Sequence, residues 1–225
     1  MTDRVANCVT DFNALPLFPL GTVLFPGGSL PLQIFEVRYL DMVQRCHREG
    51  TPFGVVCLTQ GSEVMQRDRQ GGEGFRPESF HTVGTLAQIV EFDQPQPGLL
   101  VIATQATERF RIKSSQRLKY GLWVAEAEPV PADPVVAIPE ELAGIAQALH
   151  QLNQRLQQEQ PGLIGPYPDY APSGTPWQEA GWVANRWAEL LPLPVETKQQ
   201  LLTLDNPLLR LELVGDALDQ MGIEH

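Results

Sequence analysis

The chain has 225 residues, enough for one large domain or two small ones that each bury a hydrophobic core. Apolar residues make up 43% and charged residues 19% of it, which excludes a wholly disordered protein. Residues 126–225 hold 4 of the 16 Lys and Arg but 15 of the 27 Asp and Glu, so they carry the whole net charge of −11 and disfavour nucleic-acid binding.

Residues 14–35 predict two short strands joined by a turn. Four prolines interrupt the segment, and each removes a backbone donor that a helix would need: Pro16, Pro19, Pro26 and Pro31. We expect strands at 15–18 and 30–35, with a turn at Pro26-Gly27-Gly28 between them, because Pro fixes φ and Gly permits a positive φ.

The next segment, residues 36–49, predicts a helix, since apolar residues recur with helical period along one broad face. Glu36 suits the positive end of the helix dipole, and Gly50 is placed to end the helix. Arg38 is expected on the polar face. The apolar run 53–58 then predicts a buried strand.

Residues 60–79 are polar and glycine-rich, which predicts a surface excursion. Further strands are expected at 81–92, 99–103, 108–112 and 118–128, with Pro95-Gln-Pro97-Gly98 breaking the run after the first. Short strands separated by turns are typical of a small barrel or sandwich. The basic residues of this region are expected on the solvent face of a strand pair: Arg109, Arg111, Lys113, Arg117 and Lys119.

After residue 131 the pattern becomes helical, and helices are expected at 139–158, 177–191, 195–204 and 207–222. Asn206 is a natural N-cap, and both Pro194 and Pro207 stand where the first helical position tolerates proline. The Pro- and Gly-rich residues 161–176 predict a linker or an ordered loop.

The three cysteines, Cys8, Cys46 and Cys57, are odd in number and include no CxxC pair, which disfavours a disulfide framework or a structural zinc site. The N-terminal residues lack the apolar stretch of a signal peptide, and no apolar run comes near the ~20 residues of a membrane span. These features predict a cytoplasmic protein without a membrane segment. The sequence leaves the oligomeric state open.

Four segments, taken in order, closely resemble the N-terminal domain of the ATP-dependent protease Lon, and above all the small bacterial proteins that carry this domain alone. They are LPLFPLGTVLFPGGSLPLQIFEVRYLDMV (15–43), PFGVV (52–56), VGTLAQIVEF (83–92) and ATERFRIKS (106–114). The helical region 139–222 is similar more loosely. The resemblance implies an α+β fold, with a small PUA-like β-barrel containing one inserted helix in residues 1–131 and an α-helical bundle in residues 132–225.

The resemblance also implies a role in binding polypeptides, because this region of Lon helps to engage substrates. The partner expected is an unfolded or partly unfolded polypeptide, or a partner protein that the chain serves as an adaptor. Within the matching segments, eight residues are expected to be structural, as turn formers, helix-start residues or close-packed strand positions: Pro26, Gly27, Glu36, Arg38, Tyr39, Gly84, Arg109 and Phe110.

The motifs of enzymes are missing from the sequence. It has no GxxxxGK[ST] phosphate loop, no GxSxG elbow and no HExxH metal helix, and nothing after the helices supplies Lon's Ser–Lys dyad. The histidines are scattered, which disfavours a metal site. We therefore expect a non-catalytic protein without a cofactor.

Aromatic residues beside Gly- and Pro-rich segments are the candidate polypeptide-binding surface: Phe75, Tyr167, Tyr170, Trp177 and Trp182. The alternative is that they pack the helices onto the barrel; Trp182 and Trp187 lie about 140° apart around a helix, so only one of them need be core. Two other functions stay open. One is RNA binding through a basic patch around residues 109–119, and the other is a small-molecule enzyme or sensor with a deep pocket.

Overall fold

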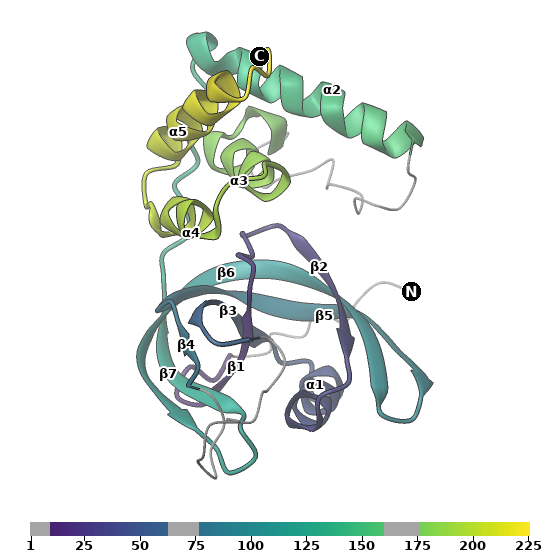
Figure 1. Cartoon of the computed structure of the whole chain (residues 1–225). Helices are drawn as coiled ribbons and strands as arrows, with labels where there is room; N and C mark the ends of the chain where they lie inside the picture. The colour runs from purple at the N-terminus through teal and green to yellow at the C-terminus, as the bar shows by residue number, and fades with distance from the viewer. Residues whose placement is uncertain (1–9, 63–76, 160–175) are drawn as a thin grey trace. The chain divides into compact units, whose positions relative to one another are not determined.

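The computed structural model describes residues 10–62, 77–159 and 176–225, drawn in colour in Figure 1. They belong to two compact units. The barrel unit comprises Met1–Pro26 and Leu30–Pro131, and the helical unit comprises Gly27–Ser29 and Ala132–His225. Within the described ranges, no helix is both long and apolar enough to cross a membrane.

The first part of the chain forms strands with one helix inserted after the second strand. In chain order the elements are β1 (Leu15–Leu20), β2 (Ser29–Ile34), α1 (Val37–Glu49), β3 (Phe53–Gln60), β4 (Ser79–Phe80), β5 (Val83–Gln96), β6 (Leu99–Arg117) and β7 (Trp123–Pro129).

Strand pairings close into a ring, which makes this sheet a small barrel (Figure 1). β1 runs antiparallel to β7, with Leu15 opposite Ala125, and parallel to β3, with Leu17 opposite Gly54. Antiparallel pairs β7–β6, β6–β5 and β5–β3 complete the circuit, while β2 pairs with β6 and β4 with β3. The expected fold class, a small barrel with one inserted helix followed by helices, is confirmed.

The barrel interior is packed around the ring of Phe110, which is fully buried. A Cβ atom on Gly54 would lie 2.6 Å from Cζ of this ring. A Cβ on Gly84 would lie 2.9 Å from the same atom and would collide with the carbonyl oxygen of Val55. Glycine is therefore the residue that fits at both positions, because backbone and aromatic ring approach too closely for a side chain.

α1 covers a second part of this core with its apolar face. Tyr39, Met42, Val43 and Cys46 are buried there together with Phe18 and Phe53. Gly50 adopts φ 69° and ends the helix, as the sequence predicted.

The helical unit contains short 3-10 turns and longer helices. They are η1 (Glu140–Leu142), α2 (Ala143–Glu159), η2 (Pro176–Gln178), α3 (Ala180–Leu190), α4 (Val195–Thr203) and α5 (Pro207–Gln220). The side chain of Asn206 accepts from the backbone N–H groups of Leu208 and Leu209 at 3.0 and 3.2 Å, which confirms the predicted N-cap. Pro207 holds the first position of α5, whereas Pro194 is the N-cap of α4 rather than its first residue.

Buried polar contacts hold the helical unit together. Trp187 is buried and donates from Nε1 to the carbonyl of Ile145 at 3.0 Å. The buried guanidinium of Arg210 donates to the carboxylate of Asp133, to Asn185 Oδ1 and to backbone carbonyls. Its charge is therefore paired with a carboxylate inside the unit, as a buried guanidinium requires.

The short strand β4 was not predicted, and the longer strands differ from the predicted ones chiefly in three places. The two strands expected at 99–103 and 108–112 are one strand, β6, whose 19 residues stay paired with β5 across register shifts. β5 continues past Pro95 to Gln96, and the turn follows at Gly98, which has φ 81°. The strand expected at 118–128 starts only at Trp123, because residues 118–122 form a turn in which Gly121 N–H donates to the Leu118 carbonyl.

Two arginines expected at the surface are buried. Arg38 has 6% of its surface exposed, because two carboxylates neutralise its charge, and Arg109 has 5% exposed and donates to the carbonyl of Pro131 at 3.3 Å. The surface excursion predicted at 60–79 and the loop at 161–176 fall mostly outside the described residues.

Candidate functional site

An ion-pair network fixes the start of α1. Arg38 donates from Nε to Glu36 at 2.7 Å and from Nη1 to both carboxylate oxygens of Glu78 at 3.1 Å. The indole N–H of Trp123 donates to Glu78 as well, at 2.9 Å. Because α1, the residues before β4 and β7 all contribute, the network holds three separate segments in one arrangement.

Tyr39 lies between an aromatic ring and this network. Its ring stacks on Phe18 with centroids 4.1 Å apart, and the guanidinium carbon of Arg38 lies 4.5 Å from the Tyr39 centroid. Burial raises the pKa of the Tyr39 phenol well above its ordinary value, so the hydroxyl stays protonated at neutral pH. Tyr39 has 2% of its surface exposed, and within the described chain its hydroxyl has no hydrogen-bond partner.

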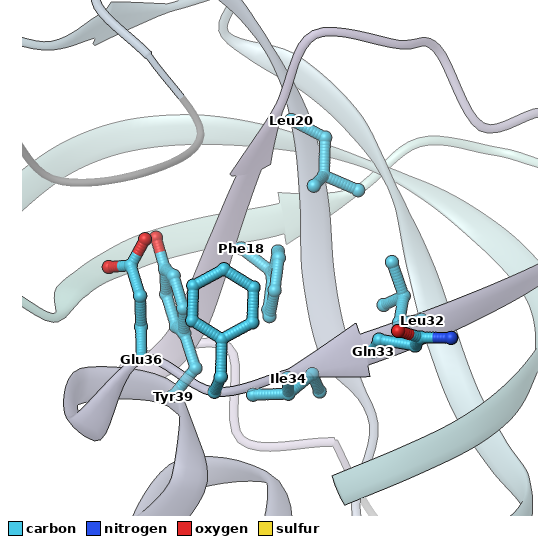
Figure 2. A pocket seen from close by; sticks show the side chains of 8 residues that line it. Phe18, Leu20, Leu32, Gln33, Ile34, Glu36 and Tyr39 are labelled. Atoms are coloured by element: carbon cyan, nitrogen blue, oxygen red, sulfur yellow. The ribbon is translucent and has the colours of Figure 1, made fainter. Parts of the chain in front are cut away.

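Beside this stack lies a recess of about 90 Å³ between β1 and β2. Figure 2 shows Glu36 and Tyr39 at one end, Leu32 and Gln33 at the other, and Phe18 and Ile34 between them. Leu20 and Phe35 complete the lining. The walls are therefore mostly apolar, with a carboxylate and a neutral hydroxyl at one end.

Exposed apolar side chains stand on the two segments that Arg38 joins. Phe35 and Val37, before and at the start of α1, have 58% and 74% of their surface exposed. Tyr120, in the turn between β6 and β7, has 78% exposed. The carbonyl of Gly121 in that turn lies 3.4 Å from Arg38 Nη1 and accepts from it. We call Phe35, Val37 and Tyr120 the apolar rim.

Two of the aromatic residues that the sequence singled out lie together in the helical unit. The rings of Trp177 and Trp182 are 4.8 Å apart in an edge-to-face arrangement, and Trp177 meets His150 in the same way, also at 4.8 Å. Both tryptophans are half-buried. The other three candidates, Phe75, Tyr167 and Tyr170, lie outside the described residues.

The eight family-motif residues take several positions. Glu36, Arg38 and Tyr39 belong to the network and the stack described above, and Gly84 and Phe110 to the barrel interior. Gly27 belongs to the helical unit and has φ 79°, and a Cβ there would lie 3.7 Å from Nη2 of Arg186 in the same unit. The sequence therefore singled out residues beside the recess, but as structural ones.

Sequence reasoning missed the recess and the apolar rim. A signal was present in the run Phe35-Glu36-Val37, which places two apolar side chains around the acidic residue that precedes a helix. A second signal was the sequence of β2, SLPLQI, in which every second residue is Leu or Ile, as in a strand with one side exposed.

The described residues hold no cluster of three or more His, Cys, Asp or Glu suited to a metal ion. Cys46 is a buried free thiol, and burial raises its pKa, which disfavours the reactive thiolate. The basic residues of β6 do not all face solvent either: Arg109 is buried, and Lys113 pairs with Glu128 at 3.0 Å.

Comparison with known families identifies the chain. Residues 14–220 match the model of the ATP-dependent protease La (LON) substrate-binding domain. The chain belongs to this family. The match spans both the barrel unit and the helical unit, so the LON substrate-binding domain here includes the recess, the apolar rim and the tryptophan pair.

Individual relatives agree with the assignment to the LON substrate-binding domain. The chain is 26% identical over 211 residues to a Lon protease of Anaeromyxobacter dehalogenans and 30% identical over 199 residues to one of Roseiflexus castenholzii. These alignments cover 92% and 85% of this chain but 23% and 22% of the relatives, so the chain spans under a quarter of their length.

Two solved structures share its fold. A crystal structure of a Lon N-terminal domain protein from Xanthomonas campestris is 31% identical, with a TM-score of 0.66, and the match covers 90% of this chain and 96% of that one. The N-terminal domain of a Mycobacterium avium complex Lon protease is 18% identical, with a TM-score of 0.54 and coverage of 91% and 97%. The second likeness concerns the fold alone.

Proposed function

We propose that this chain is a non-catalytic binding module that engages unfolded or partly unfolded polypeptides, either directly or as an adaptor for another protein. The observation that carries the proposal is the match of residues 14–220 to a substrate-binding domain of a protease. The substrates of a protease of this kind are polypeptides, and segments that have lost their fold expose apolar side chains that a folded protein buries.

The apolar rim supports the proposal. Phe35, Val37 and Tyr120 each expose more than half of their surface, although large apolar side chains gain free energy when they are removed from water. Aromatic residues are over-represented among the side chains that dominate binding free energy. The rim can therefore bind apolar side chains of a partner with favourable free energy, whatever the exact sequence around those side chains.

Rigidity of the surroundings also favours binding. Arg38 connects the segment of Phe35 and Val37 to the turn of Tyr120, and its own charge is buried against Glu36 and Glu78. A surface that is already ordered loses less conformational entropy on binding. The network is thus a structural support for the rim.

Neither alternative from the sequence gains support from the described residues. RNA binding needs a continuous basic surface, whereas Arg109 is buried and Lys113 is paired with Glu128. A recess of about 90 Å³ is well below the ~300–1,000 Å³ of typical small-molecule pockets. The tryptophan pair of the helical unit stays a predicted second contact surface.

The test is fluorescence anisotropy with a labelled, carboxymethylated protein that cannot refold, titrated with the full chain at low and high salt. A folded protein and an RNA oligonucleotide serve as competitors. We expect binding that survives high salt and that Phe35→Ser combined with Tyr120→Ser weakens by about tenfold. Val90→Ser is the matched control, because Val90 is 59% exposed and belongs to β5, which is neither of the two segments that carry the rim. The proposal would be contradicted if the wild-type chain, the double variant and Val90→Ser bound the carboxymethylated protein equally well. It would also be contradicted if the chain preferred RNA and that binding depended steeply on salt.

A further inference from the structure

The recess lies along a strand edge that has no strand partner among the described residues. β2 pairs with β6 and with no other described strand. Three consecutive β2 residues, Leu32, Gln33 and Ile34, line the recess, although successive side chains of a strand point to opposite faces. They can share one recess because it runs beside the strand, along its open edge.

The opposite wall of the recess is also incompletely paired. β1 pairs with β7 through Leu15–Leu17, and with β3 through Leu17–Leu20. Beyond Leu17, β1 therefore has a described strand on one side only, and Phe18 and Leu20 of this part line the recess. The recess separates two strand edges that do not pair with each other.

Backbone alternation decides which groups of β2 face the open edge. The carbonyl of Leu30 accepts from Thr104 Oγ1 of β6 at 3.0 Å, so the even-numbered residues direct their backbone groups toward β6. Pro31 has no N–H to offer, and proline in a sheet occupies positions whose N–H side faces away from the neighbouring strand. By this alternation the N–H and carbonyl of Gln33 point to the open edge.

Resting on the function proposed above, we propose that an extended segment of the bound polypeptide adds to the open edge of β2 and inserts one aliphatic side chain into the recess. Strand edges are templates for an extended chain, whose main chain gives affinity while a pocket selects alternate side chains. Gln33 is the residue of β2 that pairs with the added strand.

Volume and polarity select the inserted side chain. With about 30 Å³ for each water molecule in the liquid, a recess of about 90 Å³ has room for some three to four heavy atoms, which suits Leu, Ile or Met and not an indole. Arg38 Nε already donates to the Glu36 carboxylate, so an inserted lysine would not find an unpaired negative charge there.

A host–guest peptide series tests the inserted side chain. The probe is a labelled peptide of alternating Thr and Ser with one central guest residue, Leu, Ala, Trp or Lys, titrated with the full chain. We expect the Leu guest to bind about tenfold or more tightly than Ala, Trp or Lys. An affinity order that follows hydrophobicity alone, with Trp first, would overturn the proposed insertion.

Paired substitutions at Gln33 test the added strand. Gln33→Pro removes the N–H that faces the open edge, and Gln33→Ala removes only the side chain. We expect Gln33→Pro to weaken binding of the Leu peptide about tenfold or more and Gln33→Ala to leave it nearly unchanged. Circular dichroism should show a cooperative thermal unfolding transition for both variants, which confirms that both are folded. Equal affinities of the two variants would overturn strand addition.

The carboxymethylated protein separates this inference from the proposed function. If wild-type chain binds that protein while the guest series and the Gln33 pair show no selectivity, polypeptide binding stands and the strand-edge site is wrong. If wild-type chain binds neither the carboxymethylated protein nor the Leu peptide, the proposed function itself fails.

Discussion

Arg38 donates from Nη1 to both carboxylate oxygens of Glu78 at 3.1 Å, and this pair joins the first turn of α1 to the residue that precedes β4. Both side chains are almost fully buried, with 2% and 4% of their surface exposed. Buried ion pairs rarely add much net stability, but losing one partner leaves an uncompensated charge in the interior.

Glu78→Gln is therefore expected to destabilise the chain by about 3 kcal/mol, because it removes one of the two carboxylates that the described residues place against the buried Arg38 charge. The measurement is the free energy of unfolding from urea denaturation. Lys113→Gln is the control, since it breaks a pair whose side chains are half-exposed, and it should leave the midpoint unchanged. Similar midpoints for Glu78→Gln and wild type would show that the network is not a support.

Gly84→Ala is expected to destabilise the barrel by about 3 kcal/mol or to prevent folding, because the added methyl group meets the Val55 carbonyl and the Phe110 ring. Thermal unfolding followed by circular dichroism measures the effect. Ser115→Ala, at an exposed position of β6, provides a comparison in which the transition temperature should not move. A Gly84→Ala protein as stable as wild type would contradict the packing around Phe110.

Alkaline unfolding should report the burial of Tyr39. Its pKa in the folded chain is raised above the ordinary value of 10.0, so above pH 10 the unfolded chain releases the proton while the folded chain retains it. The free energy of unfolding should therefore fall as pH rises above 10. In Tyr39→Phe this loss should be smaller, while stability at pH 7 stays the same or rises, because the variant lacks a buried hydroxyl that has no hydrogen-bond partner among the described residues. If the free energy of unfolding fell equally with pH in wild type and Tyr39→Phe, the raised pKa of Tyr39 would be contradicted.

The two tryptophans of α3 should respond differently to substitution. Trp187→Ala is expected to lower the free energy of unfolding by about 3–5 kcal/mol, because it empties a buried site and removes the bond to the Ile145 carbonyl. Trp182 is half-buried, so Trp182→Ala should be less destabilising. Whether Trp182→Ala also weakens binding of the carboxymethylated protein decides between the predicted contact surface and simple packing.

Local signals predicted most elements of this fold. The helical period of residues 36–49, the glycine after them and the cap at Asn206 each depend on neighbours a few positions away, and the structure confirms all three. The continuity of β6 escaped prediction, because a strand of 19 residues is maintained by pairing with β5 and β7 rather than by its own composition. The barrel itself was expected only through the family resemblance, and the order of its strands was not predicted.

The candidate site was harder to predict for the same reason. The burial of Arg38 depends on Glu78, forty positions away in the chain, so a helix-face argument placed it in solvent. The recess depends on which strand edges stay unpaired, and that is a property of the whole sheet. Aromatic residues beside proline-rich segments were visible in the sequence, whereas a gap between β1 and β2 was not.

The closed ring of strands has a consequence for synthesis on the ribosome. Of the barrel strands β1 is synthesised first, whereas β7, with which it pairs, is synthesised last. Leu15 therefore cannot pair with Ala125 until the whole barrel segment has been made. Until then a wholly buried strand of the finished protein lacks its neighbour, and contacts so distant in sequence form slowly. For that interval the nascent chain exposes the kind of extended apolar segment that we propose the finished domain binds in others, and it is open to the same association.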